Sequence, residues 1–389
     1  MRRYIRRLAE AFRKGDLLLL LLLVVTTAFG CLVIASTTNA TDIGPLRYLI
    51  IQIGAAGAGI LAYVVFSSID TEFFSEHRSV LIGFNLMLLF LLIPFGTDNG
   101  TGNKSWLSFP FLPFDIQPAE ICKITFPLIM ASVMASHQNR ISSVKSVLHM
   151  AFHLLLLFGL NVVISGDLGV SLIFVFIFIG MTFAGGVSMI WFLGAAGAVA
   201  AMAPIAWQFL GEYQQNRIAV LINPQLDPNG TGPRYHTVRA LRSLTGGGLT
   251  GQGLFQGTRT QTNGALFAQH TDFIFAAIGE ELGFVGCALV LLLLVLIIAR
   301  CIWVGNRSTD YLRKLVCFGA ASALIFQVII NIGMCVDVMP VIGLTLPFVS
   351  YGGSSIITLY AMLGLVSGVY ARPHATIHER YIRPPVRYQ

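Results

Sequence analysis

Charged residues are scarce in this chain. They make up 11% of the 389 residues, whereas hydrophobic residues make up 55% and the mean hydropathy is +0.76. Because a soluble globular domain carries about 25% charged residues, this composition excludes one and predicts an all-α polytopic membrane protein. The net charge of +7 would suggest nucleic-acid binding in a soluble protein. Here the cations gather at the ends of apolar runs, where membrane orientation and anionic lipids explain them better.

Several catalytic and cofactor signatures are missing. The six cysteines form no Cys-x-x-Cys pair and lie mostly in apolar runs, which favours apolar packing over disulfides or metal ligands. No Walker A pattern occurs, so the chain by itself is not an ATP-driven pump. Gly246-x-Gly248-x-x-Gly251 follows no strand, which excludes a dinucleotide site. Ser142-x-x-Lys145 lacks the companion Lys-Thr-Gly motif of penicillin-binding nucleophiles.

Long apolar runs are plentiful by contrast. A membrane-spanning helix needs about 20 apolar residues. Ten spans are predicted on this basis: 17–36, 46–66, 79–95, 119–136, 147–165, 168–184, 187–210, 272–299, 314–337 and 348–371. The first run lacks a small-residue cleavage site followed by a soluble domain, so we expect a span there and not a removed signal. The middle runs follow one another so closely that re-entrant segments remain an alternative.

The distribution of Lys and Arg predicts the orientation. Basic residues are concentrated before the first span, around 300–314 and after 371, and such segments remain on the cytoplasmic side. We therefore expect a basic cytoplasmic N-terminus at 1–16, one transmembrane domain at 17–371 and a basic cytoplasmic tail at 372–389. The long segment 211–271, between the seventh and eighth spans, is then extracytoplasmic.

The organising feature is an acid at the boundary between this long segment and the eighth span. Asp272 stands at that boundary, and Glu280 and Glu281 follow inside the apolar run. Acids in such places are costly unless they have a function or a partner. On a helix with 100° per residue, Glu280 lies about 80° from Asp272 and Glu281 points to the far side. We therefore expect Glu280 to extend a polar path below Asp272 and Glu281 to pair with another helix.

Other polar residues fall at the same side of the membrane. Gly and Pro make segment 96–118 an irregular outer loop. Glu120 and Lys123 then share one helix face at i, i+3, where they form a structural ion pair or place the lysine near a diphosphate. Asp167 either caps the next helix or forms a polar wall of the same vestibule.

The segment 211–271 is too long for an idle connection. Turn signals separate 212–222 and 234–244, which could form short amphipathic helices at the interface. Arginines in this segment, Arg217 among them, suit an anionic lipid-linked ligand or contact lipid headgroups. The turn 339–355 is rich in small and hydroxyl residues, which favours close approach of another helix.

Three motifs carry a family resemblance: Gln117-Pro118-Ala119-Glu120, the run His270–Gly283, and the run Leu346–Ser355. They resemble the SEDS family, which comprises the RodA, FtsW and SpoVE peptidoglycan polymerases. Asp227-Pro228-Asn229-Gly230, Gly246-Gly247-Gly248 and Lys104-Ser105-Trp106 add to the resemblance. Two segments depart from it. Ala268-Gln269 stands where the family usually has Pro-Glu, and 232–236 stands where a Gly-Tyr-Gln run is common.

The resemblance implies a ten-helix glycosyltransferase of the bacterial cytoplasmic membrane that polymerises lipid II at the outer face. It also implies a class B penicillin-binding protein as transpeptidase partner, and it leaves open whether the chain serves elongation, division or sporulation. Asp272 matches the family's proposed catalytic base. The residues predicted to bind substrate are Lys104, Trp106, Glu120, Lys123, Asp167, Arg217, His270, Thr271 and Glu280.

The chemistry is consistent with one carboxylate. An acceptor hydroxyl must lose a proton as it attacks the anomeric carbon, so one base suffices, and direct attack would invert that centre. The diphosphate leaving group needs its charge met by Lys123, Arg217 or a divalent cation such as Mg or Mn. Two alternatives remain: a lipid-linked sugar flippase that uses Glu280, Glu281 and Lys123 as a relay, and a non-enzymatic scaffold of the cell-wall machinery.

Overall fold

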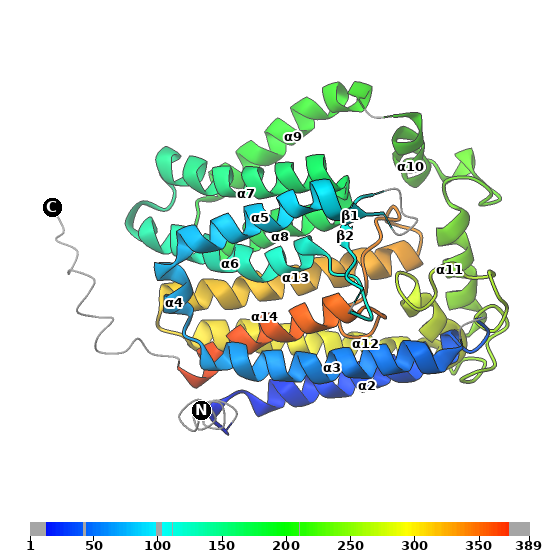
Figure 1. The fold of residues 1–389 in the computed structure, drawn as a ribbon. Helices are drawn as coiled ribbons and strands as arrows, with labels where there is room; N and C mark the ends of the chain where they lie inside the picture. The colour runs from blue at the N-terminus through cyan, green and yellow to red at the C-terminus, as the bar shows by residue number, and fades with distance from the viewer. Residues whose placement is uncertain (1–12, 42–43, 99–102, 111, 210, 373–389) are drawn as a thin grey trace.

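The computed structural model describes residues 13–41, 44–98, 103–110, 112–209 and 211–372. Its main body is a bundle of apolar helices that run side by side (Figure 1). They are α2 Leu17–Thr37, α3 Pro45–Ser68, α5 Arg78–Phe95, α6 Pro118–Ser136, α7 Val144–Ser165, α8 Leu168–Ala184, α9 Met189–Phe209, α12 Ile274–Arg307, α13 Tyr311–Cys335 and α14 Gly353–Ala371. Each predicted span corresponds to one of these helices.

Eight of these helices are long and apolar enough to cross a membrane, and α8 and α9 are shorter apolar helices. The chain is therefore an all-α, multi-pass membrane protein, as predicted. The three closely joined runs form α7, α8 and α9, each without a break into two half-helices. A left-handed Gly166 (φ 72°) makes the tight turn from α7 to α8, a conformation that glycine adopts at no steric cost.

The bundle has two distinct ends. The described ends of the chain meet at one of them, here called the terminal end, where the Asp16 carboxylate accepts hydrogen bonds from Arg300 and the Asp16 amide donates to Ser367. A short helix that was not predicted, α4 Thr71–Glu76, lies there and is capped by Asp70. Most of the predicted basic segments 1–16 and 372–389 lies outside the described residues.

The centre of the bundle is formed by α6, α13 and α14, which are the most buried of the spanning helices. Small residues let backbones approach closely there: Gly364 of α14 lies against the backbone of Tyr63 on α3, and Gly59 faces the ring of Tyr360. Such contacts stabilise helix pairs where burial of apolar surface supplies little driving force. In contrast, α9 is largely exposed and lies apart from the other helices (Figure 1).

The opposite end, here called the loop end, carries the connecting segments (Figure 1). The two predicted amphipathic helices are confirmed as α10 Glu212–Ile222 and α11 Tyr235–Gly246, separated by the 3-10 turn η2 Pro224–Leu226. Segment 96–118 is irregular apart from a short antiparallel pair, β1 Gly96–Thr97 and β2 Trp106–Leu107. Another 3-10 turn, η1 Gln138–Arg140, follows α6 at the terminal end.

A break in α12 gives the glycine-rich segment its structural role. Gly283 has φ 66° and ψ −163°, which interrupts the helix and leaves backbone groups without helical partners. The glycine-rich segment supplies them: the Gln252 amide donates to the Glu280 carbonyl at 3.0 Å, and the Gly248 carbonyl accepts from the Phe284 amide at 2.9 Å. Unpaired backbone groups are costly away from water. The glycine-rich segment therefore stabilises the break by forming hydrogen bonds with these groups.

Only glycine permits this backbone-to-backbone contact. A Cβ atom on Gly247 would lie 1.9 Å from the Gly279 carbonyl oxygen, and one on Gly251 would lie 2.2 Å from the Glu281 carbonyl oxygen. Neither carbonyl can move aside without disturbing α12. The dinucleotide-like spacing of these glycines therefore reflects packing against α12.

We expect Gly251→Ala to destabilise the protein more than Gly248→Ala. Both residues have positive φ, but a Cβ on Gly248 meets nothing within 4 Å. Gly248→Ala then carries only the left-handed backbone cost of about 1–2 kcal/mol, whereas Gly251→Ala adds an overpacking cost of about 1–3 kcal/mol. Thermal unfolding of the two detergent-purified variants measures the difference, and equal losses in Tm would contradict the packing role.

Candidate active site

A cavity of about 630 Å³ opens at the loop end of the bundle. Its wall draws on residues of 103–117, the first turns of α6 and α8, α10, α13, and the loops 267–272, 341–345 and 351–355. Of the ten residues predicted from sequence for the site, six line this cavity: Trp106, Glu120, Asp167, Arg217, Thr271 and Asp272. Lys104, Lys123, His270 and Glu280 do not.

Hydrogen bonds to backbone carbonyl groups hold Asp272 in position. It lies just before α12, and its carbonyl accepts a hydrogen bond at 2.8 Å from the Asn331 side chain of α13, which also donates to the Leu344 carbonyl at 2.7 Å. The neighbouring Thr271 carbonyl accepts from the Ser350 hydroxyl at 2.6 Å. One asparagine and one serine thus tie the acid to α13 and to the loop before α14, while its carboxylate faces the cavity.

The environment of Asp272 favours its protonated form. Burial raises the pKa of Asp272 to about 6, and the negative charge of Asp167 adds to the shift, because both effects disfavour a second ionised carboxylate. Among the described residues, no lysine or arginine forms an ion pair with Asp272. A carboxyl group with a pKa near 6 suits proton transfer near neutral pH.

Asp167 combines the two roles considered for it. Its carboxylate caps α8 by accepting from the Val170 amide at 3.0 Å, and it also accepts from the Gln117 side chain at 3.1 Å. Burial raises the pKa of Asp167, and these hydrogen bonds oppose that rise. Capping fixes the carboxylate in the cavity wall, where its charge influences Asp272.

Glu120 and Lys123 form the predicted ion pair on α6. The Lys123 Nζ lies 2.6 Å from a Glu120 carboxylate oxygen, and both side chains are buried. The Thr358 hydroxyl of α14 donates to the same oxygen at 3.1 Å. Glu120 reaches the cavity wall, whereas Lys123 lies outside the lining. A direct contact between Lys123 and substrate therefore stays a prediction.

Arg217 is the only lysine or arginine in the cavity wall within the described parts of the chain. It projects from α10 and donates to the Val341 carbonyl at 3.0 Å, so a loop anchors its guanidinium. Trp106 of β2 contributes an aromatic wall, and Lys104, two residues before it, is exposed outside the lining. The cavity thus combines a carboxylate, an arginine and an aromatic ring.

His270 lies two residues before Asp272 but outside the cavity lining, where its ring packs against two tyrosines. Its ring centroid lies 5.0 Å from that of Tyr48 on α3 and 5.8 Å from that of Tyr351, and its carbonyl accepts from the Tyr351 amide at 2.8 Å. These contacts position the segment before Asp272. A direct contact between His270 and substrate stays a prediction.

The polar path expected from Asp272 to Glu280 does not form. Glu280 is 1% exposed and accepts a hydrogen bond from the Arg259 amide of the loop. The expectation assumed one straight helix from Asp272, but α12 begins at Ile274 and the loop packs over Glu280. The predicted pairing of Glu281 with another helix is confirmed, because the Ser36 hydroxyl of α2 donates to its carboxylate.

Sequence reasoning missed Gln327. This residue of α13 is 1% exposed and lines the cavity, yet neither its amide nitrogen nor its amide oxygen has a hydrogen-bond partner among the described residues. A buried amide without partners is costly, which marks it as a group that a ligand can satisfy. The available signal was a glutamine inside an apolar run, where polar residues tend to be functional.

The departure from the resembling family at 232–236 has a structural counterpart. Arg234 forms an ion pair with Asp337 at the end of α13, and the Thr237 hydroxyl donates to the same carboxylate at 2.5 Å. These contacts tie α11 to α13 outside the cavity lining. The other departure places Gln269 behind the site, where its amide donates to the Thr37 and Thr260 carbonyls.

Comparison with known proteins agrees with the geometry. The family model of cell cycle proteins named for FtsW, RodA and SpoVE matches residues 16–374. The chain is 34% identical over 345 residues to the peptidoglycan glycosyltransferase MrdB of Escherichia coli strain K12, which covers 88% of this chain and 90% of that protein. It is 32% identical over 313 residues to the probable peptidoglycan glycosyltransferase FtsW of Haemophilus influenzae, covering 79% and 76%.

Solved structures show the same fold. A chain of a peptidoglycan synthase complex that coordinates polymerization and crosslinking superposes with a TM-score of 0.77 at 29% identity, covering 92% of this chain and 97% of that one. The rod shape determining protein RodA of Thermus thermophilus gives a TM-score of 0.67 at 26% identity, with coverage of 92% and 97%. This chain therefore belongs to the FtsW, RodA and SpoVE family of cell cycle proteins.

Proposed function

We propose that this protein is a peptidoglycan glycosyltransferase that polymerises lipid II, with Asp272 as general base. The observation that carries the proposal is a carboxylate of raised pKa without an ion-pair partner among the described residues, which faces a cavity that also holds Arg217. The identity to relatives named peptidoglycan glycosyltransferases supports the same reaction class.

The proposed reaction uses one base. Asp272, with a pKa of about 6, is mostly ionised at neutral pH and accepts the proton of the attacking sugar hydroxyl. The same pKa keeps the carboxylate basic enough to assist the attack. Asn331 and Ser350 hold the backbone around it, so little reorganisation is needed as the proton moves.

The departing lipid diphosphate needs positive charge. Arg217 is placed to supply it from the cavity wall, and a guanidinium suits bidentate contact with phosphate oxygens. Lys123 lies behind Glu120 and forms an ion pair with it. Lys104 is exposed near Trp106, where it can meet the approaching phosphates. Because direct attack displaces the diphosphate from the opposite face, the proposal includes inversion at the anomeric centre.

We further propose that a divalent cation helps to neutralise the negative charge of the departing diphosphate. Mg²⁺ is commonly held by one or two carboxylates together with substrate phosphates, and Asp115, Glu120 and Asp167 all belong to the cavity wall. Among the described residues, no group of three or more His, Cys, Asp or Glu side chains gathers in a metal-binding arrangement. The substrate diphosphate would therefore have to complete the coordination of Mg or Mn, which would neutralise the developing charge.

The flippase alternative receives no support from the predicted relay. It required Glu280, Glu281 and Lys123 to form a polar path through the membrane. Glu280 and Glu281 are bound by the loop 252–261 and by α2, and Lys123 is paired with Glu120.

The orientation and partner belong to the same proposal. Placing both termini in the cytoplasm, as the distribution of Lys and Arg predicts, puts the loop end and its cavity on the outer side of the membrane. The similar chain in a peptidoglycan synthase complex supports assembly with a crosslinking enzyme. We propose a class B penicillin-binding protein as that partner.

Asp272→Asn should abolish polymerisation without unfolding the protein. The amide has nearly the same shape and cannot accept the proton, so the rate should fall at least about 100-fold, as for loss of a general base. Glycan strands formed from lipid II by the purified protein with its partner measure the effect. Glu212→Gln, an equivalent change at an exposed site on α10, is the control. Wild-type polymerisation by a folded Asp272→Asn protein would exclude the base.

The activity should depend on pH through the same group. Protonated Asp272 cannot act as a base, so kcat/KM should fall as pH decreases below about 6, the pKa that burial and Asp167 produce. Asp167→Asn removes the neighbouring negative charge, which should move the midpoint to lower pH. Profiles of kcat/KM against pH for both proteins check this. An unmoved or raised midpoint would contradict the electrostatic coupling.

Gln327→Met should weaken substrate use and leave stability unchanged or higher. The variant removes a buried amide that has no partner in the described structure, so folding loses nothing, whereas a substrate hydrogen bond worth about 1 kcal/mol would be lost. We expect KM to rise about fivefold to tenfold. Asn331→Leu is the contrast, because that amide donates two hydrogen bonds and its loss should lower Tm. An unchanged KM in Gln327→Met would exclude the contact.

A further inference from the structure

A second polar cavity lies at the terminal end, far from the candidate active site. It has a volume of about 430 Å³ and is bordered by the end of α4, the start of α5 and the end of α6. Its polar lining residues are Ser75, Glu76, Arg78, Ser79, Ser132 and Ser136. Within the described parts of the chain, neither Glu76 nor Arg78 forms an ion pair. The cavity therefore holds one negative and one positive charge, neither of which is in an ion pair within the described residues.

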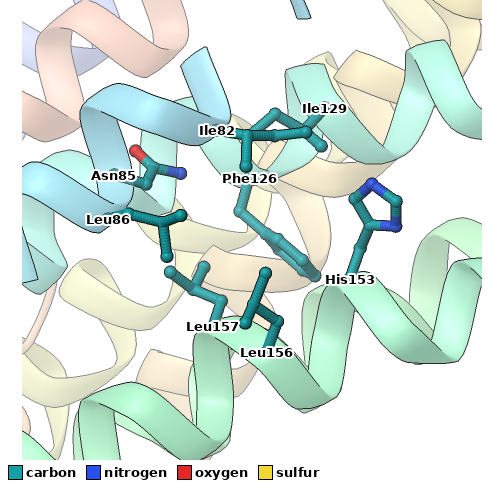
Figure 2. Close-up of a pocket in the computed structure, with 8 residues that line it drawn as sticks. All are labelled: Ile82, Asn85, Leu86, Phe126, Ile129, His153, Leu156 and Leu157. Atoms are coloured by element: carbon teal, nitrogen blue, oxygen red, sulfur yellow. The ribbon is translucent and has the colours of Figure 1, made fainter. Parts of the chain in front are cut away.

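A narrow apolar pocket lies between α5, α6 and α7 (Figure 2). Ile82 and Leu86 of α5, Phe126 of α6 and Leu157 of α7 converge on it, and Asn85 and His153 also line it. Its volume is about 20 Å³. Because a space of about 10–15 Å³ on this measure holds one water, the pocket admits no more than one or two methylene groups.

The polar cavity and the apolar pocket both border α5 and α6, and the two are together called the groove here. Residues three or four apart share a helix face. On α6, Ser132, Ile129 and Phe126 follow this spacing, and Ser79 and Ile82 do so on α5. The groove is thus polar and charged at the terminal end and apolar toward the middle of the bundle. This sequence of surfaces matches a molecule with a charged head and a hydrocarbon tail.

We propose that this groove binds a membrane phospholipid with a phosphoethanolamine headgroup. The headgroup phosphate pairs with Arg78 and accepts a hydrogen bond from the Ser79 hydroxyl, the ammonium faces Glu76, and one acyl chain passes the apolar pocket, which takes up one or two of its methylene groups. Two unpaired charges of opposite sign in one cavity complement a zwitterionic headgroup. A free phosphate would leave Glu76 and the apolar pocket without a partner, which favours a lipid over a soluble anion.

Native mass spectrometry of the full-length, delipidated protein in detergent tests the proposal. Phosphatidylethanolamine and phosphatidylglycerol of the same chain length are titrated separately. We expect tighter binding of phosphatidylethanolamine by about threefold, the scale of one exposed ion pair. Arg78→Gln should weaken binding of both lipids about tenfold, and Glu76→Gln should remove the preference between them.

Matched variants separate this site from general lipid adhesion. Arg140→Gln changes an exposed arginine of η1 at the same end that does not line the cavity, and it should leave lipid binding unchanged. Ile82→Phe adds a small volume at the apolar pocket and should weaken binding of the lipid. Soluble glycerophosphoethanolamine, which has no acyl chains, should fail to compete.

Three results would overturn the proposal. Equal losses in Arg78→Gln and Arg140→Gln would show that the lipid is held by overall charge. Effective competition by glycerophosphoethanolamine would identify a soluble headgroup as the ligand. Equal affinity of the wild-type protein for both lipids would exclude a role of Glu76 in choosing an ammonium headgroup. Circular dichroism of each variant confirms that it is folded before these comparisons are made.

Discussion

A partly buried carboxylate that forms no ion pair within the described residues is the feature on which the proposed chemistry depends. Elsewhere in the described bundle, several acids have basic partners: Asp16 has Arg300, Glu120 has Lys123, and Asp337 has Arg234. Such pairing balances the negative charge of a buried carboxylate. The buried Glu280 and Glu281 are held by hydrogen bonds instead. Asp272 has no basic partner among the residues that the structure describes, and a second carboxylate, Asp167, lies near enough to raise its pKa further. A group in this state exchanges protons near neutral pH, which a structural ion pair does not do.

The surroundings of Asp272 maintain this state by contacting the backbone instead of the carboxylate. Asn331 and Ser350 bind carbonyl groups of Asp272 and Thr271, so the acid is fixed without a hydrogen bond that would stabilise its charge. Contacts to backbone groups also stabilise the break in α12. There the glycine-rich segment satisfies exposed backbone groups, because membrane proteins tolerate irregular backbone only where protein or water provides partners.

The sequence allowed the helices, the two amphipathic segments and the resemblance to be predicted, because these depend on local apolar content, turn residues and motifs. It did not reveal the break at Gly283, since hydropathy does not distinguish a continuous helix from a kinked one. The helical-wheel argument for Glu280 failed because α12 begins only at Ile274 and the loop packs over Glu280. Glu281 paired with Ser36 as expected. Gln327 was missed because its lack of partners is a property of the packed structure. The site roles of the individual residues remain predictions.

Helix α6 relates the two ends of the protein to each other. Glu120 near its start belongs to the candidate active site, and Ser132 near its end belongs to the proposed lipid groove. At about 1.5 Å per residue, these positions lie about 18 Å apart along the helix, beyond the range of a direct contact. Removing the charge of Arg78 should therefore act on the lipid and leave the pKa of Asp272 unchanged. The proposed catalytic site and the proposed lipid site are in this way separate, located at opposite ends of one buried helix.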